Sequence, residues 1–364
     1  MNWPQARARF PVLERFAYLN AGTFGPLSRA TLDAEGELRR WEGEHGRAGK
    51  TYFDTMIERR DVVRGLIADQ IRVPHDHVAL TDSTTSGVQI VVIGLGLAAG
   101  DEVVTTDAEH FGLTGPLVAS GATLRIARVR DAPGADLYEL IRAQVTPRTR
   151  LIATSAVSWI DGKVFPWREL REATGLPVLI DGAQAAGAID EDASAADYYT
   201  VSAQKWLCGP DATGALFVRE PEALPPRLVA YPSASSYDIA AGTWEPKPGA
   251  ARFDATFTPA SSLAALEAAL TDLPAGRFER ARELTERGRE LLVEQGHDVV
   301  TEPGQATLVS FRPPGDPADA VVALYDRGVV LRELPGTGLL RASVGWWNDG
   351  SDLERLVEAL AVLR

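Results

Sequence analysis

The 364-residue sequence contains very little sulfur and few lysines. Its single cysteine, Cys208, excludes an intramolecular disulfide, which predicts a protein of a reducing compartment. Lysine occurs only at positions 50, 163, 205 and 247, so chemistry that needs an amine nucleophile has four candidate side chains. No two histidines or cysteines stand at a metal-ligand spacing, and we therefore expect no metal site.

Long apolar runs and an excess of positive charge are also missing. The longest apolar stretch, 88–99, is broken by glycine and is shorter than the roughly 20 residues that cross a bilayer. Residues 1–16 show neither a long apolar core nor a small-residue cleavage site, so we expect no signal peptide. The formal net charge of −13 predicts repulsion of nucleic-acid phosphates. We expect a cytoplasmic protein that binds neither nucleic acid nor membranes.

The middle of the chain alternates short apolar runs with helix-like segments. Helical patterns occur, for example, at 84–97, 137–144 and 167–174. This alternation is typical of an α/β fold whose mostly parallel sheet is covered on both faces, and ligands of such sheets bind beyond the carboxyl ends of the strands. The predicted strands are 77–81, 102–106, 123–127, 151–154, 178–180, 199–201 and 215–218.

The last third of the chain has a different pattern. Residues 221–259 are rich in Pro, Gly, Ser and Ala, which predicts a bridge between domains or a wall over a site. Helical patterns follow at 261–273 and 277–295. The chain then closes as a small α/β unit, with strands near 307–312, 329–331 and 340–344 and a helix from Asp352. The length itself suggests about two domains.

Two polar segments follow predicted strands and could bind a charged ligand. Residues 82–87, Asp-Ser-Thr-Thr-Ser-Gly, precede an apolar helix, whose free N–H groups suit a phosphate, although a simple N-cap explains the same residues. Asp181 ends the apolar run Val178-Leu179-Ile180. It could keep a pyridine nitrogen protonated, or it could form an ordinary Asp-Gly turn.

Three further side chains have chemical potential in an apolar setting. Lys205 follows a predicted strand among small and apolar neighbours, where a partly buried amine becomes a nucleophile toward an aldehyde; most lysines, however, lie on the surface. His110 could stack on a flat heteroaromatic ring or be structural. Arg341 could bind a substrate carboxylate or pair with an acidic residue of the protein.

Taken in this order, these residues resemble the class V aminotransferase family of fold type I pyridoxal 5'-phosphate (PLP) enzymes, which includes cysteine desulfurases, selenocysteine lyases and isopenicillin N epimerases. The resemblance runs from Tyr18 to the last helix. It implies a large PLP-binding domain, 17–258, with a mostly parallel seven-stranded sheet, and a small α/β domain formed by 1–16 and 259–364. It also implies a homodimer with active sites at the interface. Its most specific segments are Ser202-Ala203-Gln204-Lys205-Trp206-Leu207, Asp181-Gly182-Ala183-Gln184 and Arg341-Ala342-Ser343.

The resemblance implies a role for each matching position. Lys205 matches the Schiff-base lysine that also moves the α-proton, Asp181 the partner of the pyridine nitrogen, and His110 the stacked ring. Gln184 matches the donor to the phenolic oxygen, and Arg341 the residue that grips the substrate carboxylate. The implied phosphate ligands are Ser83, Thr84, Thr85, Ser202 and Gln204, with Thr258 reaching the neighbouring subunit's phosphate after a one-residue shift.

Departures from the family pattern bear on the reaction. Trp159 stands where desulfurases carry an asparagine that touches cofactor and substrate, and we expect it to contact the substrate. Residues 328–336 lack the mobile cysteine of a desulfurase, and Cys208 is expected to pack as a small apolar group. The sequence therefore predicts a β-eliminating C–S lyase acting on cysteine or a cysteine conjugate. An amino acid epimerase, an aminotransferase and a non-catalytic binding protein stay as alternatives.

Overall fold

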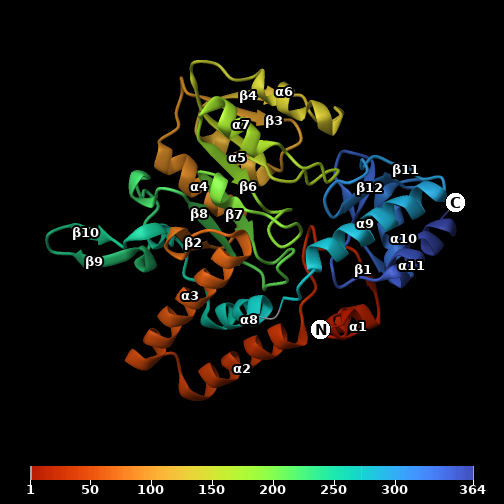
Figure 1. The fold of residues 1–364 in the computed structure, drawn as a ribbon. Coiled ribbons are helices and arrows are strands. Elements are labelled where there is room, and N and C mark those ends of the chain that lie inside the picture. The colour runs from red at the N-terminus through yellow and green to blue at the C-terminus, as the bar shows by residue number, and fades with distance from the viewer. Residues whose placement is uncertain (1, 272, 364) are drawn as a thin grey trace.

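The computed structural model describes residues 2–271 and 273–363, which fold around a mixed seven-stranded sheet (Figure 1). The strand order is β2-β8-β7-β6-β5-β3-β4, and all neighbours run parallel except at β8, which is antiparallel to both of its neighbours. The α/β class predicted from the sequence is confirmed. The strands are β2 Val78–Thr81, β3 Glu102–Thr106, β4 Thr123–Ala127, β5 Thr149–Ser155, β6 Val178–Asp181, β7 Tyr198–Ser202 and β8 Gly214–Val218.

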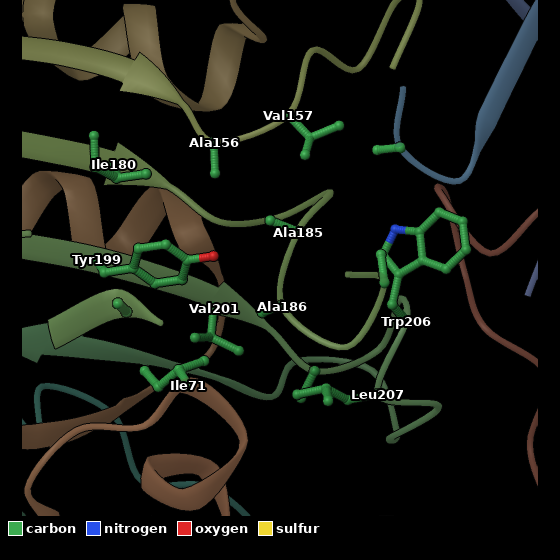
Figure 2. Packing of buried hydrophobic residues seen from close by; sticks show 14 of the residues in the cluster. Ile71, Ala156, Val157, Ile180, Ala185, Ala186, Tyr199, Val201, Trp206 and Leu207 are labelled. Atoms are coloured by element: carbon green, nitrogen blue, oxygen red, sulfur yellow. The ribbon is translucent and has the colours of Figure 1, made fainter. Parts of the chain in front are cut away.

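Four strands of this sheet, including the edge strand β2, are buried along their whole length. Every residue of β2, β3, β6 and β8 is buried, as expected where helices cover both sides of a sheet. Consecutive residues of β6 belong to apolar clusters on opposite faces of the sheet. Ile180 belongs to the cluster of Tyr199 and Val201 (Figure 2), and Leu179 belongs to the cluster of Val88. Helices connect the strands: α4 Thr84–Leu95, α5 Phe111–Ala119, α6 Leu137–Arg142 and α7 Trp167–Thr174.

Two long helices near the N-terminus lie outside the segments for which the sequence predicted structure. They are α2 Arg29–His45 and α3 Lys50–Ile71, and both pack against α8 Ala260–Thr271 (Figure 1). Buried Asp254 accepts hydrogen bonds from Arg60 and Arg64 of α3 and from the backbone N–H of Leu80 in β2. Because buried charges are tolerated only when paired, this cluster ties α3 to the edge of the sheet.

The C-terminal part of the chain forms the predicted small α/β unit around its own apolar core. Its four-stranded antiparallel sheet has the order β11-β12-β15-β14. β1 Ala17–Tyr18 pairs with β13 Val329–Val330 of this unit. The division into domains at residues 17 and 259 stays a prediction. The elements of this unit are α9 Arg277–Glu294, β11 Asp298–Val299, β12 Leu308–Arg312, α10 Pro317–Asp326, β14 Arg332–Leu334, β15 Leu339–Ser343 and α11 Gly350–Ala361. At the other end of the chain, the short helix α1 Trp3–Arg7 contributes Ala6 to the main core.

Within the predicted loop-rich segment 221–259, two strands pair as a hairpin. β9 Ala234–Asp238 and β10 Thr243–Pro246 are antiparallel and project from the body of the molecule (Figure 1). Trp244 lies opposite Tyr237, an aromatic cross-strand pair that stabilises such ribbons. Four of the five residues of β9 are exposed, so the apolar alternation that marks a strand in a sequence is missing.

None of the helices in the described residues is both long enough and apolar enough to cross a membrane.

Candidate active site

A cavity of about 230 Å³ lies beyond the carboxyl ends of the parallel strands, and residues of β14 and β15 in the C-terminal sheet also line it. All but one of the residues predicted for the site line it, although they come from positions 83 to 341. Thr258 is the exception: it is buried in the segment that precedes α8 and does not line the cavity of its own chain. The predicted residues that line the cavity are Ser83, Thr84, Thr85, His110, Trp159, Asp181, Gln184, Ser202, Gln204, Lys205 and Arg341.

Hydroxyl groups and a helix N-terminus form one end of the cavity. Ser83 caps α4, its Oγ accepting from the N–H of Ser86 at 3.2 Å, so the N-cap interpretation of segment 82–87 is correct. The next two residues, Thr84 and Thr85, also line the cavity, as does Ser202 at the end of β7. Free helical N–H groups, the positive end of the helix dipole and these hydroxyls together suit an anion such as a phosphate.

Asp181 ends β6 and is only 3% exposed. Its Oδ1 accepts from the N–H of Ala183 at 3.0 Å and from Thr200 Oγ1 at 3.4 Å, which makes it a turn residue as well as a lining residue. No arginine or lysine of the described chain forms an ion pair with it. Its negative charge is therefore available to a cationic group in the cavity.

Lys205 lies three residues after the end of β7 and lines the same cavity as Asp181. Burial lowers the pKa of Lys205 to about 8, because desolvation and the nearby Arg341 and Arg332 outweigh the attraction of Asp181. Gly25 packs against this loop so closely that a Cβ there would lie 2.0 Å from the carbonyl oxygen of Lys205. The backbone of Lys205 is thus packed tightly against Gly25, and with a pKa of about 8 a fraction of the amine is an uncharged nucleophile near neutral pH.

His110 is the N-cap of α5. Its Nδ1 accepts from the N–H of Gly112 at 3.1 Å, which requires the proton of the neutral ring to be on Nε2. Burial and the charge of Lys205 lower the pKa of His110, so the ring is neutral at physiological pH. Its plane stands edge-on to Trp159, with the ring centroids 5.3 Å apart. The capping and cavity-lining interpretations of this histidine are both compatible with the structure.

The amide of Gln184 is held at both ends. Its Oε1 accepts from the indole N–H of Trp206 at 2.9 Å, and its Nε2 donates to the carbonyl of Gly22 at 2.8 Å. Because an indole N–H can only donate, it fixes which side of the amide carries oxygen. The second hydrogen on Nε2 stays free for a ligand in the cavity.

Arg341 is fully buried on β15, and no acidic residue of the described chain forms an ion pair with it. Its Nη1 donates to the carbonyl of Trp159 at 2.7 Å, whereas Nε and Nη2 have no hydrogen-bond partner. Burial and neighbouring Arg332 lower its pKa to about 9. The predicted alternative of an internal salt bridge is therefore wrong, and a buried guanidinium in this state favours binding of an anion.

The sequence did not single out two further charged residues of this region. Arg332 lines the cavity from β14. Glu109 follows the end of β3 by three residues and does not itself line the cavity. Its Oε2 accepts from the N–H and Oγ of Ser155 at 2.9 and 2.5 Å, and its Oε1 accepts from Thr106 Oγ1 at 2.8 Å. Burial raises the pKa of Glu109 to about 7, despite these hydrogen bonds. Its position next to His110 was the one available signal in the sequence.

We expect Glu109→Gln to flatten the pH dependence of stability. Because the pKa of Glu109 is raised in the fold, its stabilising contribution is full below the unfolded value and is lost as pH rises through about 7. Between about pH 5 and about pH 8 the wild type should lose roughly 1–3 kcal/mol more unfolding free energy than the variant. Urea unfolding at both pH values measures this. Glu44→Gln, an exposed change, is the control, and parallel curves for Glu109→Gln and wild type would contradict the prediction.

Three comparisons with known proteins agree with this geometry. The model of the aminotransferase class-V family matches residues 18–356. Isopenicillin N epimerase of Streptomyces clavuligerus is 28% identical, over 100% of this chain and 98% of that protein, and a probable cysteine desulfurase of Xylella fastidiosa strain 9a5c is 25% identical, over 100% and 96%. The solved complex of the cystine C–S lyase C-DES with its reaction product cysteine persulfide superimposes with a TM-score of 0.89, at 26% identity, over 97% of this chain and 99% of that chain.

Proposed function

Because the chain belongs to the aminotransferase class-V family, and is thus a PLP-dependent enzyme of fold type I, we propose that it cleaves the C–S bond of cysteine or a cysteine conjugate by β-elimination. One observation carries the proposal. The cavity brings Lys205 and Asp181 together with Arg341, a buried guanidinium that has no acidic partner, and it contains no cysteine among its lining residues. The cavity therefore has the groups needed to bind and deprotonate an α-amino acid, but none of its lining residues is a cysteine that could accept sulfur.

The lining residues fit PLP. When bound, PLP withdraws electrons from the α-carbon of an amino acid joined to its aldehyde carbon. The hydroxyls and N–H groups at the start of α4, with Ser202 and Gln204, would hold the phosphate. Asp181 would keep the pyridine nitrogen protonated, and His110 would lie against the ring. Gln184 would donate its free N–H to the phenolic oxygen. These assignments rest on the shared cavity and on the family pattern.

Three residues would then act on the substrate. Arg341 binds the α-carboxylate through Nε and Nη2, the two atoms that have no partner in the protein. Lys205, with its pKa lowered to about 8, takes the α-proton. The electron pair of the broken Cα–H bond forms a Cα=Cβ double bond, while the pair of the C–S bond leaves with the sulfur as a thiolate. Hydrolysis of the released enamine fragment by water then yields pyruvate and ammonia. Trp159 borders the space for the side chain of the substrate.

A persulfide relay of the desulfurase type is disfavoured. Cys208 is 4% exposed, burial raises the pKa of its thiol, and it does not line the cavity. An amino acid epimerase is the second candidate, favoured by the likeness to isopenicillin N epimerase over the whole chain. It would need an acid on the second face of the substrate, and the tyrosines considered from the sequence, Tyr231 and Tyr237, do not line the cavity.

The test is proton NMR of the PLP-loaded enzyme in heavy water with cysteine, S-substituted cysteines and common amino acids. We expect pyruvate from the cysteine compounds, and we expect Cys208→Ala to form it at an unchanged rate because elimination needs no thiol. Exchange of the α-proton without pyruvate would refute the lyase and leave the epimerase or an aminotransferase. A keto acid acceptor would separate those two.

Assembly is also a proposal. The homodimer implied by the family would place Thr258 against the phosphate of the neighbouring subunit, and its position outside the cavity of its own chain is compatible with that role. We also propose that the chain is divided into a large domain, 17–258, and a small domain formed by the remaining residues. The proposed location of the protein is the cytoplasm.

A further inference from the structure

Two arginines of the C-terminal sheet stand side by side in the cavity. β14 and β15 are antiparallel, and Arg332 is the register partner of Arg341. Residues that pair in this way project from the same face with their Cβ atoms only about 4.5–5.5 Å apart. Both line the cavity. Two like charges at opposed positions are unfavourable unless an anion lies between or beside them.

No carboxylate of the described protein compensates this pair. Arg332 donates through Nε to the carbonyl of Glu333 at 3.0 Å and through Nη1 to Thr23 Oγ1 at 3.4 Å, both neutral acceptors. The side chain of Glu333, the next residue of the strand, belongs to the opposite face. On the other side of Arg341, β12 presents the neutral Ser310. The pair is thus an uncompensated positive region built into the cavity wall.

The other charged groups of the site already have partners under the proposed function. The hydroxyls and N–H groups of α4 serve the cofactor phosphate, and Asp181 serves the pyridine nitrogen. Arg341 serves the α-carboxylate of the substrate. Arg332 then remains as a cation without an anion. Trp159 adds a further donor, because its indole Nε1 is buried, has no partner and belongs to a lining residue.

Resting on the proposed function, we propose that Arg332 binds a second anionic group, on the side chain of the substrate. The enzyme then selects amino acids whose sulfur substituent ends in a carboxylate, and Arg332 determines that specificity. A guanidinium binds a carboxylate through paired charge-assisted hydrogen bonds, which neither an amide nor an alkyl substituent can replace.

The experiment compares two substrates of nearly equal shape, S-carboxymethylcysteine and its amide, S-carbamoylmethylcysteine. The PLP-loaded enzyme is titrated with each, and the dissociation constant is read from the change in visible absorption; pyruvate formation gives kcat/KM in parallel. We expect the wild type to prefer the acid by about 10- to 100-fold. Arg332→Gln should abolish this preference while leaving the amide nearly unaffected, and Arg332→Lys should keep part of it. Arg312→Gln, an exposed change in the same sheet, is the matched control.

The outcomes separate the alternatives. Equal affinity of the wild type for acid and amide overturns the proposal, and this result needs no variant to fold. A loss in Arg332→Gln that is equal for both substrates also overturns it, because Arg332 would then share the α-carboxylate with Arg341. A preference for the acid that Arg332→Gln abolishes supports the proposal. If the wild type prefers the acid but forms no pyruvate, β-elimination is refuted, whereas the proposed role of Arg332 in binding the second carboxylate is retained.

Discussion

Replacement of Lys205 by alanine is expected to lower turnover by about 10³-fold or more and to end covalent attachment of the cofactor. Among the described residues, Lys205 is the one lysine that lines the cavity, and burial lowers its pKa to about 8, so under the proposed function its amine serves both as nucleophile and as base. Absorption spectra of the purified variant and steady-state rates of pyruvate formation measure the two effects. The variant should still bind PLP through the other lining groups.

A chemical map provides the control for this prediction. Borohydride reduction of the wild type, followed by peptide mass spectrometry, should place the cofactor mass on Lys205 and on none of the other three lysines. Lys50→Ala is the matched variant, because Lys50 lies exposed on α3, where it pairs with Asp54. Turnover near the wild-type rate in Lys205→Ala, or a label on another lysine, would refute the assignment and with it the proposed mechanism.

Asp181→Asn is expected to lower turnover by about 10²- to 10³-fold with the cofactor still bound. Asparagine keeps the shape and the hydrogen bond that Oδ1 accepts from Ala183, so the turn after β6 should persist. It removes the negative charge that would hold a proton on the pyridine nitrogen, and electron withdrawal by the ring weakens accordingly. The rate of pyruvate formation and the absorption spectrum are the measurements.

The control for Asp181→Asn is Asp190→Asn, which removes an exposed carboxylate that pairs with Arg72 and does not line the cavity. It should leave turnover and spectrum unchanged. Wild-type turnover in Asp181→Asn would show that Asp181 is only the turn residue that an Asp-Gly pair commonly forms. Loss of bound cofactor in the variant would instead assign it a role in binding.

The sequence by itself determined the central sheet. Strands such as β6 and β8 consist mainly of apolar residues because both faces are buried, and this composition can be recognised in the sequence without knowing which strands are neighbours. It also determined the position of Asp181 and Lys205, since polar residues at or shortly after the carboxyl end of a buried strand lie at the sheet edge where ligands bind. The hairpin β9–β10 escaped prediction because exposed strands carry no apolar alternation.

Only the tertiary structure decided what surrounds Arg341. Its sequence context allowed either an internal salt bridge or a ligand, and the choice depended on whether folding brings a carboxylate within reach. None of the described acidic residues pairs with it, and the register of β14 on β15 brings Arg332 beside it instead. Register is set by how two strands pair, so the sequence of one strand alone does not reveal which residues lie opposite it in the sheet. The chemistry of single residues was therefore readable from the sequence, whereas the charge balance of the cavity was set by packing.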